Sequence, residues 1–167
     1  MANTPEVQAK KGFPQTGSGD AAHAARQTAS FRAQKICESD VRLFVENFAT
    51  AANISPKWSF RLQLIADELF INAIDYGTES ENDQIEIVLE KNNEQLSVAV
   101  SDPGKKGQML PDQLRKKIND VQSSANPLAQ GGKGISLIVH QWANQLDIES
   151  MQPRGLRITA RIILLKE

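Results

Sequence analysis

One stretch, from Asp67 to Gly77, constrains the fold most, because it predicts the end of an amphipathic helix with a polar stripe. Apolar residues recur at helical intervals before and within it, at Leu62, Ile65, Leu69 and Ile74. Glu68 and Asn72 are four positions apart, so they share one face of the helix, and Asp75 continues their stripe. Gly77 is expected to end the helix as a left-handed C-terminal cap. A polar stripe on a helix that is otherwise apolar indicates either an ordinary solvated face or a bound cation with its anionic ligand.

Composition and charge narrow the class of protein. A chain of 167 residues is long enough for one domain with a substantial core. The formal net charge of −1 favours neither nucleic acid nor an anionic membrane as a partner. The single cysteine, Cys37, excludes a disulfide framework. No apolar run approaches the ~20 residues that span a bilayer, and the N-terminus lacks the apolar core of a signal peptide. We therefore expect a cytoplasmic protein.

The chain divides into a tail and a domain. Residues 1–27 are poor in large apolar side chains. They bury too little surface to offset the entropy lost on ordering, so we expect a disordered tail. Residues 28–167 are expected to form one folded domain that begins with a short strand over 28–33. Ser55 as N-cap and Pro56 at the first helical position predict where the helix with the polar stripe begins.

The remaining periodicities predict an α+β fold. Three-four spacing of apolar residues predicts a helix over 38–52. Strict alternation predicts a hairpin of two strands, around Ile85–Leu89 and Leu96–Val100. The pattern then predicts a buried helix and two closing strands, over residues 134–142, 145–150 and 156–165. Strand pairs interspersed with helices fit a two-layer α/β sandwich, in which a mixed, mostly antiparallel sheet has helices on one face.

A long polar connection interrupts this pattern. Residues 105–133 are rich in Gly, Ser, Gln and Lys, and only Pro111–Val121 within them predicts a short helix. A connection of this length inside a compact domain is usually functional or disordered. We interpret it as a lid.

Two short motifs contain residue types suited to nucleotide chemistry. The oxygen of Asn72 suits a hard cation such as Mg²⁺, and Glu68 can accept a proton from a hydroxyl held within hydrogen-bond reach. Asp102 ends a strand, where its carboxylate can accept a hydrogen bond from an adenine amino group. Gly104 would let the backbone approach the base closely. Each motif also has an ordinary explanation, a solvated helix face for the first and a plain turn for the second.

The third motif is the sequence Gly131-Gly132-Lys133-Gly134 before the buried helix. Free N–H groups at a helix N-terminus bind phosphate, and glycines allow that approach. Lys133 can add a point charge, although a flexible glycine loop is the alternative interpretation. The motif is not a Walker P-loop, because Gly134 follows the lysine where that motif has Ser or Thr. It is not a dinucleotide fingerprint either.

In this order and spacing, the three motifs together resemble the Bergerat-type ATP-binding fold of the histidine-kinase-like, or GHKL, superfamily. That superfamily contains gyrase, the heat-shock chaperone ATPases, histidine kinases and mismatch-repair ATPases. Within it, the chain looks most like the small anti-sigma-factor serine/threonine kinases of bacteria. The resemblance covers about residues 28–167, and it depends on the segments DELFINAIDYG, SDPG and GGKGISLI.

The resemblance implies a role for each matching residue. Asn72 would be the Mg²⁺ ligand and Glu68 the general base. Asp102 would bind adenine with Gly104 beside the base, and Asp75 is included among the nucleotide-binding residues. The residues of the glycine loop would contact the phosphates: Gly132, Lys133 and Gly134.

The sequence departs from the family's pattern at two places. After SDPG the family tends to continue with another glycine and an aromatic residue, where this chain has Lys105 and Lys106. In the last strand the family often places a threonine shortly after the turn glycine, Gly155. Here the threonine comes at Thr159, which we predict to lie near the adenine. These departures affect the expected lid geometry more than the nucleotide site.

The resemblance therefore implies a kinase that uses ATP and Mg²⁺. It would phosphorylate an antagonist protein on Ser or Thr and sequester a sigma factor in a partner switch. A homodimer is implied as well, without direct contact to nucleic acid or membrane. Two alternatives remain open. One is an ATP-gated binding module without kinase activity, and the other is a detached histidine-kinase catalytic domain.

Overall fold

The computed structural model describes residues 24–122, 135 and 141–164. Residues 1–23 of the predicted tail lie outside this range, as do the whole glycine loop and most of the helix predicted over 134–142. Among the helices that are described, none has both the length and the apolar character needed to cross a membrane.

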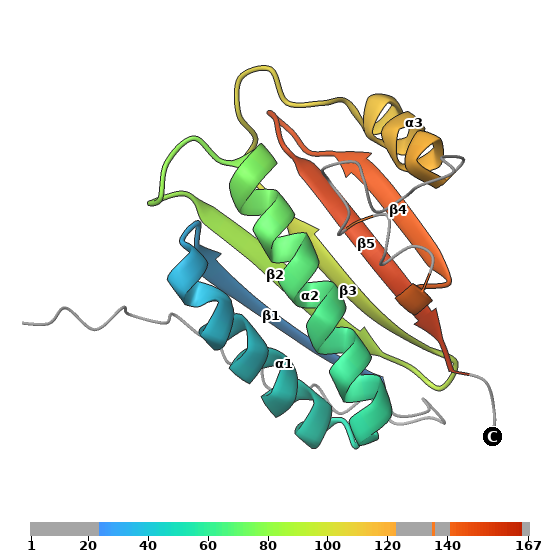
Figure 1. The fold of residues 1–167 in the computed structure, drawn as a ribbon. Helices are drawn as coiled ribbons and strands as arrows, with labels where there is room; N and C mark the ends of the chain where they lie inside the picture. The colour runs from blue at the N-terminus through green and yellow to red at the C-terminus, as the bar shows by residue number, and fades with distance from the viewer. Residues whose placement is uncertain (1–23, 123–134, 136–140, 165–167) are drawn as a thin grey trace, which may run out of the picture.

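Five strands form one sheet in the order β1-β2-β3-β5-β4, and each neighbouring pair is antiparallel (Figure 1). The strands are β1 Ala25–Arg32, β2 Gln84–Lys91, β3 Gln95–Ser101, β4 Gln145–Ser150 and β5 Leu156–Ile163. The helices are α1 Glu38–Ala51, α2 Pro56–Gly77 and α3 Pro111–Gln122, with a 3-10 turn at Lys35–Cys37. Helices α1 and α2 cover one face of the sheet, and α3 contacts β4 (Figure 1). The predicted two-layer α+β fold is confirmed.

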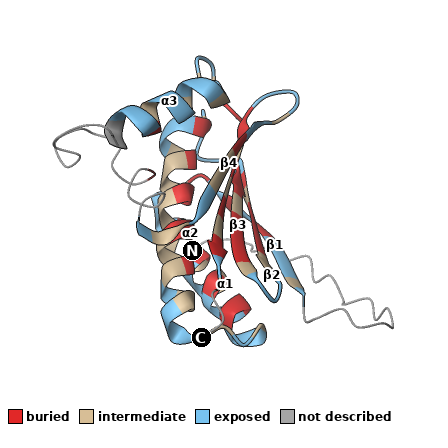
Figure 2. Ribbon diagram, turned by 90° about the vertical axis from the view of Figure 1, so that its right-hand side faces the viewer, coloured by how far each residue is buried: buried red, intermediate tan, exposed pale blue. Residues whose placement is uncertain are grey.

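The core lies between the sheet and the two long helices, whose facing sides are buried (Figure 2). Alternation along β2 directs Ile85 and Leu89 into this core, where both are fully buried. Phe31 of β1 packs against Phe44 of α1 and Phe70 of α2, with ring centroids 5.8 and 6.1 Å apart. Burial of such apolar area is the main stabilising contribution, and it holds α2 firmly against the sheet.

The opposite face of the sheet has no such helix layer among the described residues (Figure 2). It carries charged side chains that form ion pairs. Arg157 of β5 pairs with Glu86 of β2, with 3.4 Å between Nη2 and Oε1. Arg161 pairs with Asp147 of β4. Because side chains alternate along a strand, Thr159 shares this outer face with the two arginines. The Thr159 side chain therefore lies on the face away from α2, which matters for its predicted place near the adenine.

One strand boundary and the capping of both ends of α2 differ from the sequence predictions. Strand β1 begins at Ala25 instead of Thr28. Ser55 occupies the N-cap position of α2 and Pro56 begins the helix as predicted, but the Ser55 side chain makes no capping hydrogen bond. Gly77 is the last residue of α2 and is not among the glycines with positive φ. The prediction of a left-handed cap at Gly77 is therefore wrong, and the residue has a different role in the site.

Candidate nucleotide-binding site

A cavity lies beside the C-terminal half of α2, where the loop after β3, helix α3 and strand β5 meet. Apolar side chains from the sheet and from α3 line it: Val100, Leu114, Ile118, Leu156 and Ile158. A few polar side chains converge on it as well: Asn72, Asp102, Lys105, Gln108 and Lys117. An apolar cavity with a small number of polar groups is the usual form of a small-molecule site.

Asp102 is the most constrained polar residue of the cavity. One carboxylate oxygen, Oδ1, accepts hydrogen bonds from the backbone N–H groups of Gly104, at 2.9 Å, and Leu156, at 3.1 Å. It also accepts one from the side-chain amide of Gln108, at 3.0 Å. The Asp102 N–H in turn donates to the Leu156 carbonyl at 3.0 Å. Because these bonds all reach Oδ1, the second oxygen, Oδ2, is the one suited to a ligand.

The environment of Asp102 opposes its charge. Burial raises the pKa of this carboxyl above its usual value, while the hydrogen bonds from Gln108, Leu156 and Gly104 act to lower it. A carboxylate that has lost hydration gains from any donor that a ligand brings. An amino group on a flat aromatic ring fits this requirement, and the exocyclic amine of adenine is such a group.

Three glycines allow the backbone to close around Asp102. A Cβ atom at Gly77 would lie 2.2 Å from Asp102 Cγ, and one at Gly155 would lie 2.2 Å from the Asp102 carbonyl oxygen. At Gly104, whose φ is +80°, a Cβ would lie 2.6 Å from the backbone nitrogen of Gly155. No side chain fits at these distances. The end of α2, the loop after β3 and the β4–β5 turn are therefore in direct contact around Asp102.

Asn72 lines the same cavity from α2. Its side-chain nitrogen donates to the backbone carbonyl of Glu68 at 2.7 Å, so its oxygen is the atom suited to a cation. The described residues contain no group of three or more His, Cys, Asp or Glu side chains that would hold a metal ion. Mg²⁺ commonly binds through one or two protein oxygens together with substrate phosphates and water. Asn72 therefore suits Mg²⁺ that arrives with a nucleotide.

Glu68 lies one helical turn before Asn72 and is half-buried, but it is not among the residues that line the cavity. Burial raises the pKa of Glu68, and the negative charges of Asp67 and Glu38 raise it further. Asp67 itself accepts a hydrogen bond from Arg42 Nε at 2.6 Å. A raised pKa lies closer to neutral pH, and a general base is most effective when its pKa is near the pH at which it works.

Two lysines and a tyrosine at the cavity were not assigned from the sequence. The ammonium groups of Lys105 and Lys117 lie 5.9 and 5.7 Å from the centre of the Tyr76 ring. Lys105 also donates to the backbone carbonyl of Asp75 at 2.7 Å. These cations provide positive charge at the site, which suits an anionic ligand. Lys105 begins the predicted lid and Lys117 lies on α3, so the sequence alone does not indicate that they meet.

The structure does not bring two of the predicted residues into the cavity. The side chain of Asp75 is exposed and pairs with Lys35, with 3.7 Å between Oδ1 and Nζ. Thr159 lies on the outer face of the sheet, because it alternates with the cavity residue Ile158. Neither side chain lines the cavity, and the nucleotide-binding roles predicted for Asp75 and Thr159 stay predictions. The predicted phosphate-contacting residues lie outside the described range: Gly132, Lys133 and Gly134.

The sequence analysis did not assign several other residues to the site, although some of them belong to recognisable sequence patterns. Gly155 was visible as a turn glycine, but its contact with Asp102 requires the β4–β5 turn to reach the β3 loop. Gln108 carried no signal, because a glutamine in a polar connection is unremarkable in sequence. Leu114 and Ile118 lie four residues apart on the predicted short helix, so they share one side of α3, and both line the cavity.

Comparison with known proteins identifies the family. The family model for the histidine kinase-like ATPase domain matches residues 31–162. No curated protein matches the chain. A chain in the crystal structure of the SiaB-SiaC complex from Pseudomonas aeruginosa is similar in fold, with a TM-score of 0.54 and 11% sequence identity. That match covers 82% of this chain and 89% of the other. On the match to the family model, this chain belongs to the histidine kinase-like ATPase domain family.

Proposed function

We propose that this protein is an ATP-dependent serine/threonine kinase of the anti-sigma-factor type. It phosphorylates an antagonist protein and sequesters a sigma factor in a partner switch. Membership of a histidine kinase-like ATPase family implies ATP binding. The acceptor residue, the sigma factor and the homodimer are parts of the proposal. Since a sigma factor acts inside the cell, the proposal also places the protein in the cytoplasm.

The observation that carries the proposal is the position of Asp102 and Asn72 on one cavity. Asp102 presents one free oxygen for an adenine amino group, and apolar side chains of β3, β5 and α3 suit the faces of a purine ring. Asn72 presents an oxygen for Mg²⁺ on the same side of α2. Bound Mg²⁺ would supply neutralisation of phosphate charge, and Lys105 and Lys117 would add to it.

The transfer step assigns Glu68 the role of general base. The acceptor hydroxyl oxygen bonds to the γ-phosphorus while the bond from that phosphorus to the bridging oxygen breaks, and ADP leaves. Glu68 takes the proton of the hydroxyl. Its raised pKa, caused by burial and by Asp67 and Glu38, supports this role. Most of the acceleration would come from positioning and charge neutralisation, as in other phosphoryl transfers.

A protein partner is supported by analogy of fold. The similar solved chain was crystallised in a complex of two proteins, SiaB and SiaC. A fold of this kind therefore accommodates a protein partner in at least one known complex. For this chain we propose an antagonist that carries the acceptor serine or threonine, and a sigma factor that competes with it.

The decisive experiment incubates the protein with labelled ATP, Mg²⁺ and the candidate antagonist encoded nearest to it. We expect label on the antagonist in an acid-stable form, because phosphoserine and phosphothreonine survive acid. An acid-labile product would indicate phosphohistidine and favour a detached histidine-kinase catalytic domain. Glu68→Gln is the matched variant, and label at the wild-type rate in that variant would refute the role of Glu68.

One observation favours the second candidate, an ATP-gated binding module without kinase activity. Asn72 and Asp102 line the cavity, whereas Glu68 does not. Such a module would bind its partner more tightly with ATP than without it and would leave the antagonist unlabelled. Partner affinity measured with ATP and with ADP separates the two functions, because the module requires a difference in affinity without any transfer.

A further inference from the structure

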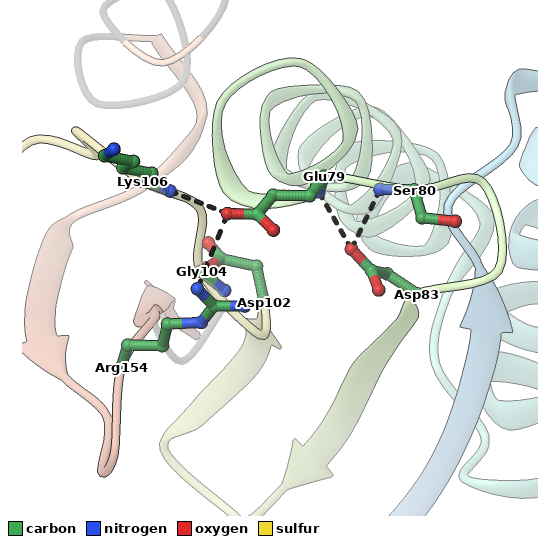
Figure 3. Close-up of polar contacts among 7 residues, drawn as sticks. All are labelled: Glu79, Ser80, Asp83, Asp102, Gly104, Lys106 and Arg154. Atoms are coloured by element: carbon green, nitrogen blue, oxygen red, sulfur yellow. Dashed lines mark hydrogen bonds and ion pairs between the residues drawn. The ribbon is translucent and has the colours of Figure 1, made fainter.

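Three segments meet around Asp102, and one exposed carboxylate joins them (Figure 3). They are the turn after α2, the loop after β3 and the β4–β5 turn. The carboxylate belongs to Glu79, two residues beyond the end of α2. No motif in the sequence draws attention to it, and it does not line the cavity.

The backbone of Glu79 is itself fixed. The N–H groups of Glu79 and Ser80 both donate to Asp83 Oδ2, at 2.8 and 3.1 Å. Asp83 immediately precedes β2, and its own N–H donates to the Ser80 carbonyl at 3.0 Å. The turn is thereby attached to the rigid sheet, so the Glu79 side chain extends from a fixed point (Figure 3).

The Glu79 carboxylate makes two contacts across the site. Its Oε1 accepts a hydrogen bond from the backbone N–H of Lys106 at 2.9 Å. The same oxygen lies 3.4 Å from Arg154 Nη1. Lys106 belongs to the loop that begins at Asp102, and Arg154 belongs to the turn that contains Gly155. Glu79 therefore contacts both the loop that contains Asp102 and the β4–β5 turn that packs against this loop.

The two segments that Glu79 contacts are tightly packed against each other. Gly104 lies between Asp102 and Lys106, and a Cβ there would come within 2.8 Å of the Gly155 Cα and 3.1 Å of Arg154 Cγ. The loop and the turn are thus already in contact with each other, and Glu79 holds both against the end of α2. A shift of either segment would displace Gly104 and Leu156, which donate to Asp102 Oδ1.

We propose that Glu79 is a positioning residue for nucleotide selection. It holds the β3 loop and the β4–β5 turn so that Asp102 keeps the orientation that recognises the amino group of adenine. This inference rests on the proposed ATP site. It goes beyond that proposal by assigning base selectivity to a residue that does not touch the base.

The exposure of the pair decides which measurement is informative. The Glu79 and Arg154 side chains are 47% and 58% exposed. Solvent-exposed ion pairs contribute little to stability, because water and salt screen them. Loss of Glu79 should therefore leave the melting temperature nearly unchanged while it loosens the Asp102 loop. The ratio of the affinities for two nucleotides that differ only in the amino group reports that loosening. A general loss of structure would instead weaken the binding of all nucleotides alike.

The test compares the affinity of the full chain for ATP and for purine riboside triphosphate, which lacks the 6-amino group. Calorimetry on the wild type and on Glu79→Ala gives both dissociation constants. We expect the wild type to prefer ATP, and Glu79→Ala to reduce that preference by about three- to tenfold, the size of effect of one lost hydrogen bond. Glu79→Gln retains an acceptor for the Lys106 N–H and should recover most of the preference.

Glu81→Ala is the matched control, since Glu81 is an exposed glutamate in the same turn. It makes the same change in charge and should leave the ratio at the wild-type value. An unchanged ratio in Glu79→Ala, with ATP binding intact in the wild type, would overturn this inference alone. Failure of the wild type to bind either nucleotide would overturn the proposed ATP site and this inference together. An equal effect in Glu81→Ala would replace it with a general charge effect.

Discussion

The two ends of the proposed nucleotide site are constructed differently. At the Asp102 end, backbone N–H groups and three close-packed glycines hold one carboxylate in place. At the Glu68 end, side chains extend from the regular helix α2, and the negative charges of Asp67 and Glu38 raise the pKa of Glu68. Recognition of the base is thus largely preorganised by the main chain. At the end proposed to be catalytic, burial and two neighbouring carboxylates raise the pKa of Glu68, and among the described residues no backbone N–H group holds its carboxylate.

The largest effect that would distinguish the two ends is expected for Glu68→Gln. Loss of a general base typically lowers the rate by about 10²- to 10⁴-fold, while ATP affinity should stay within about twofold because Glu68 does not line the cavity. Transfer to the antagonist and calorimetric ATP binding are measured on the same preparation. A parallel loss of both quantities would show that the two ends are not separable.

Asp102→Ala should have the converse effect. A hydrogen bond to a charged group contributes about 1.5–3 kcal/mol, so ATP affinity should fall about ten- to a hundredfold. Asn72→Ala is the partner variant at the other end, and its effect should appear with Mg²⁺ and disappear with a chelator. Calorimetry with and without Mg²⁺ checks both expectations. An Asp102→Ala effect that required Mg²⁺ would contradict the assignment of adenine to this end.

Gly77→Ala probes the backbone packing at the Asp102 end. The new methyl group would lie 2.2 Å from Asp102 Cγ, so the buried carboxylate must move. We expect ATP affinity to fall about tenfold, approaching the effect of losing the hydrogen bond itself. Gly77 is the last residue of α2, so alanine gains there less than the ~1 kcal/mol of helix propensity that it gains in a helix interior, and this gain does not remove the steric clash.

Calorimetry and thermal unfolding check the Gly77→Ala prediction together. Unchanged ATP affinity in this variant would mean that the position of Asp102 is less constrained than the contacts indicate. Gly77→Ala in an Asp102→Ala background should have little further effect on binding, because the two changes act through one group.

The smallest effect near neutral pH concerns the titration of Glu68. A general base must be deprotonated, so the transfer rate should rise with pH through the pKa of Glu68. Because burial and the charges of Asp67 and Glu38 raise that pKa, the rise should be centred above the usual value of 4.5. The pH profile of kcat at saturating ATP measures it. A profile centred at or below the usual value would contradict the environment described here.

Much of the fold could be predicted from the sequence because its signals are local. Alternation in β2 and β3 and three-four spacing in α1 and α2 each reflect burial of one face, and the structure confirms all four elements. Asn72, Asp102 and Gly104 were predicted because their residue types and spacing match a known pattern, and Asn72 and Asp102 line one cavity. The glycine loop at 131–134 stays a prediction.

Three residues lie differently from what their local pattern indicated, because a local pattern does not specify which other segment a side chain faces. Asp75 continues the helical stripe of Asn72 by spacing, yet in the structure it turns to Lys35. Thr159 lies on the outer face of β5, because side chains alternate along the strand and its neighbour Ile158 faces the cavity. Its role in nucleotide binding stays a prediction. Gly77 was interpreted from its position at a helix end, whereas its need for glycine comes from a contact with Asp102.

The sequence by itself determined the elements, the layer of helices and the chemical types available to the site. These follow from periodicity and short motifs, which act over a few residues. Only the tertiary structure decided that Gly155 and Gln108 contact Asp102 and that Glu79 contacts Lys106 and Arg154, because contacts between segments far apart in the chain depend on how the sheet brings its turns together. The sheet order places β3 beside β5, and this pairing brings the loop after Ser101 into contact with the turn before Leu156.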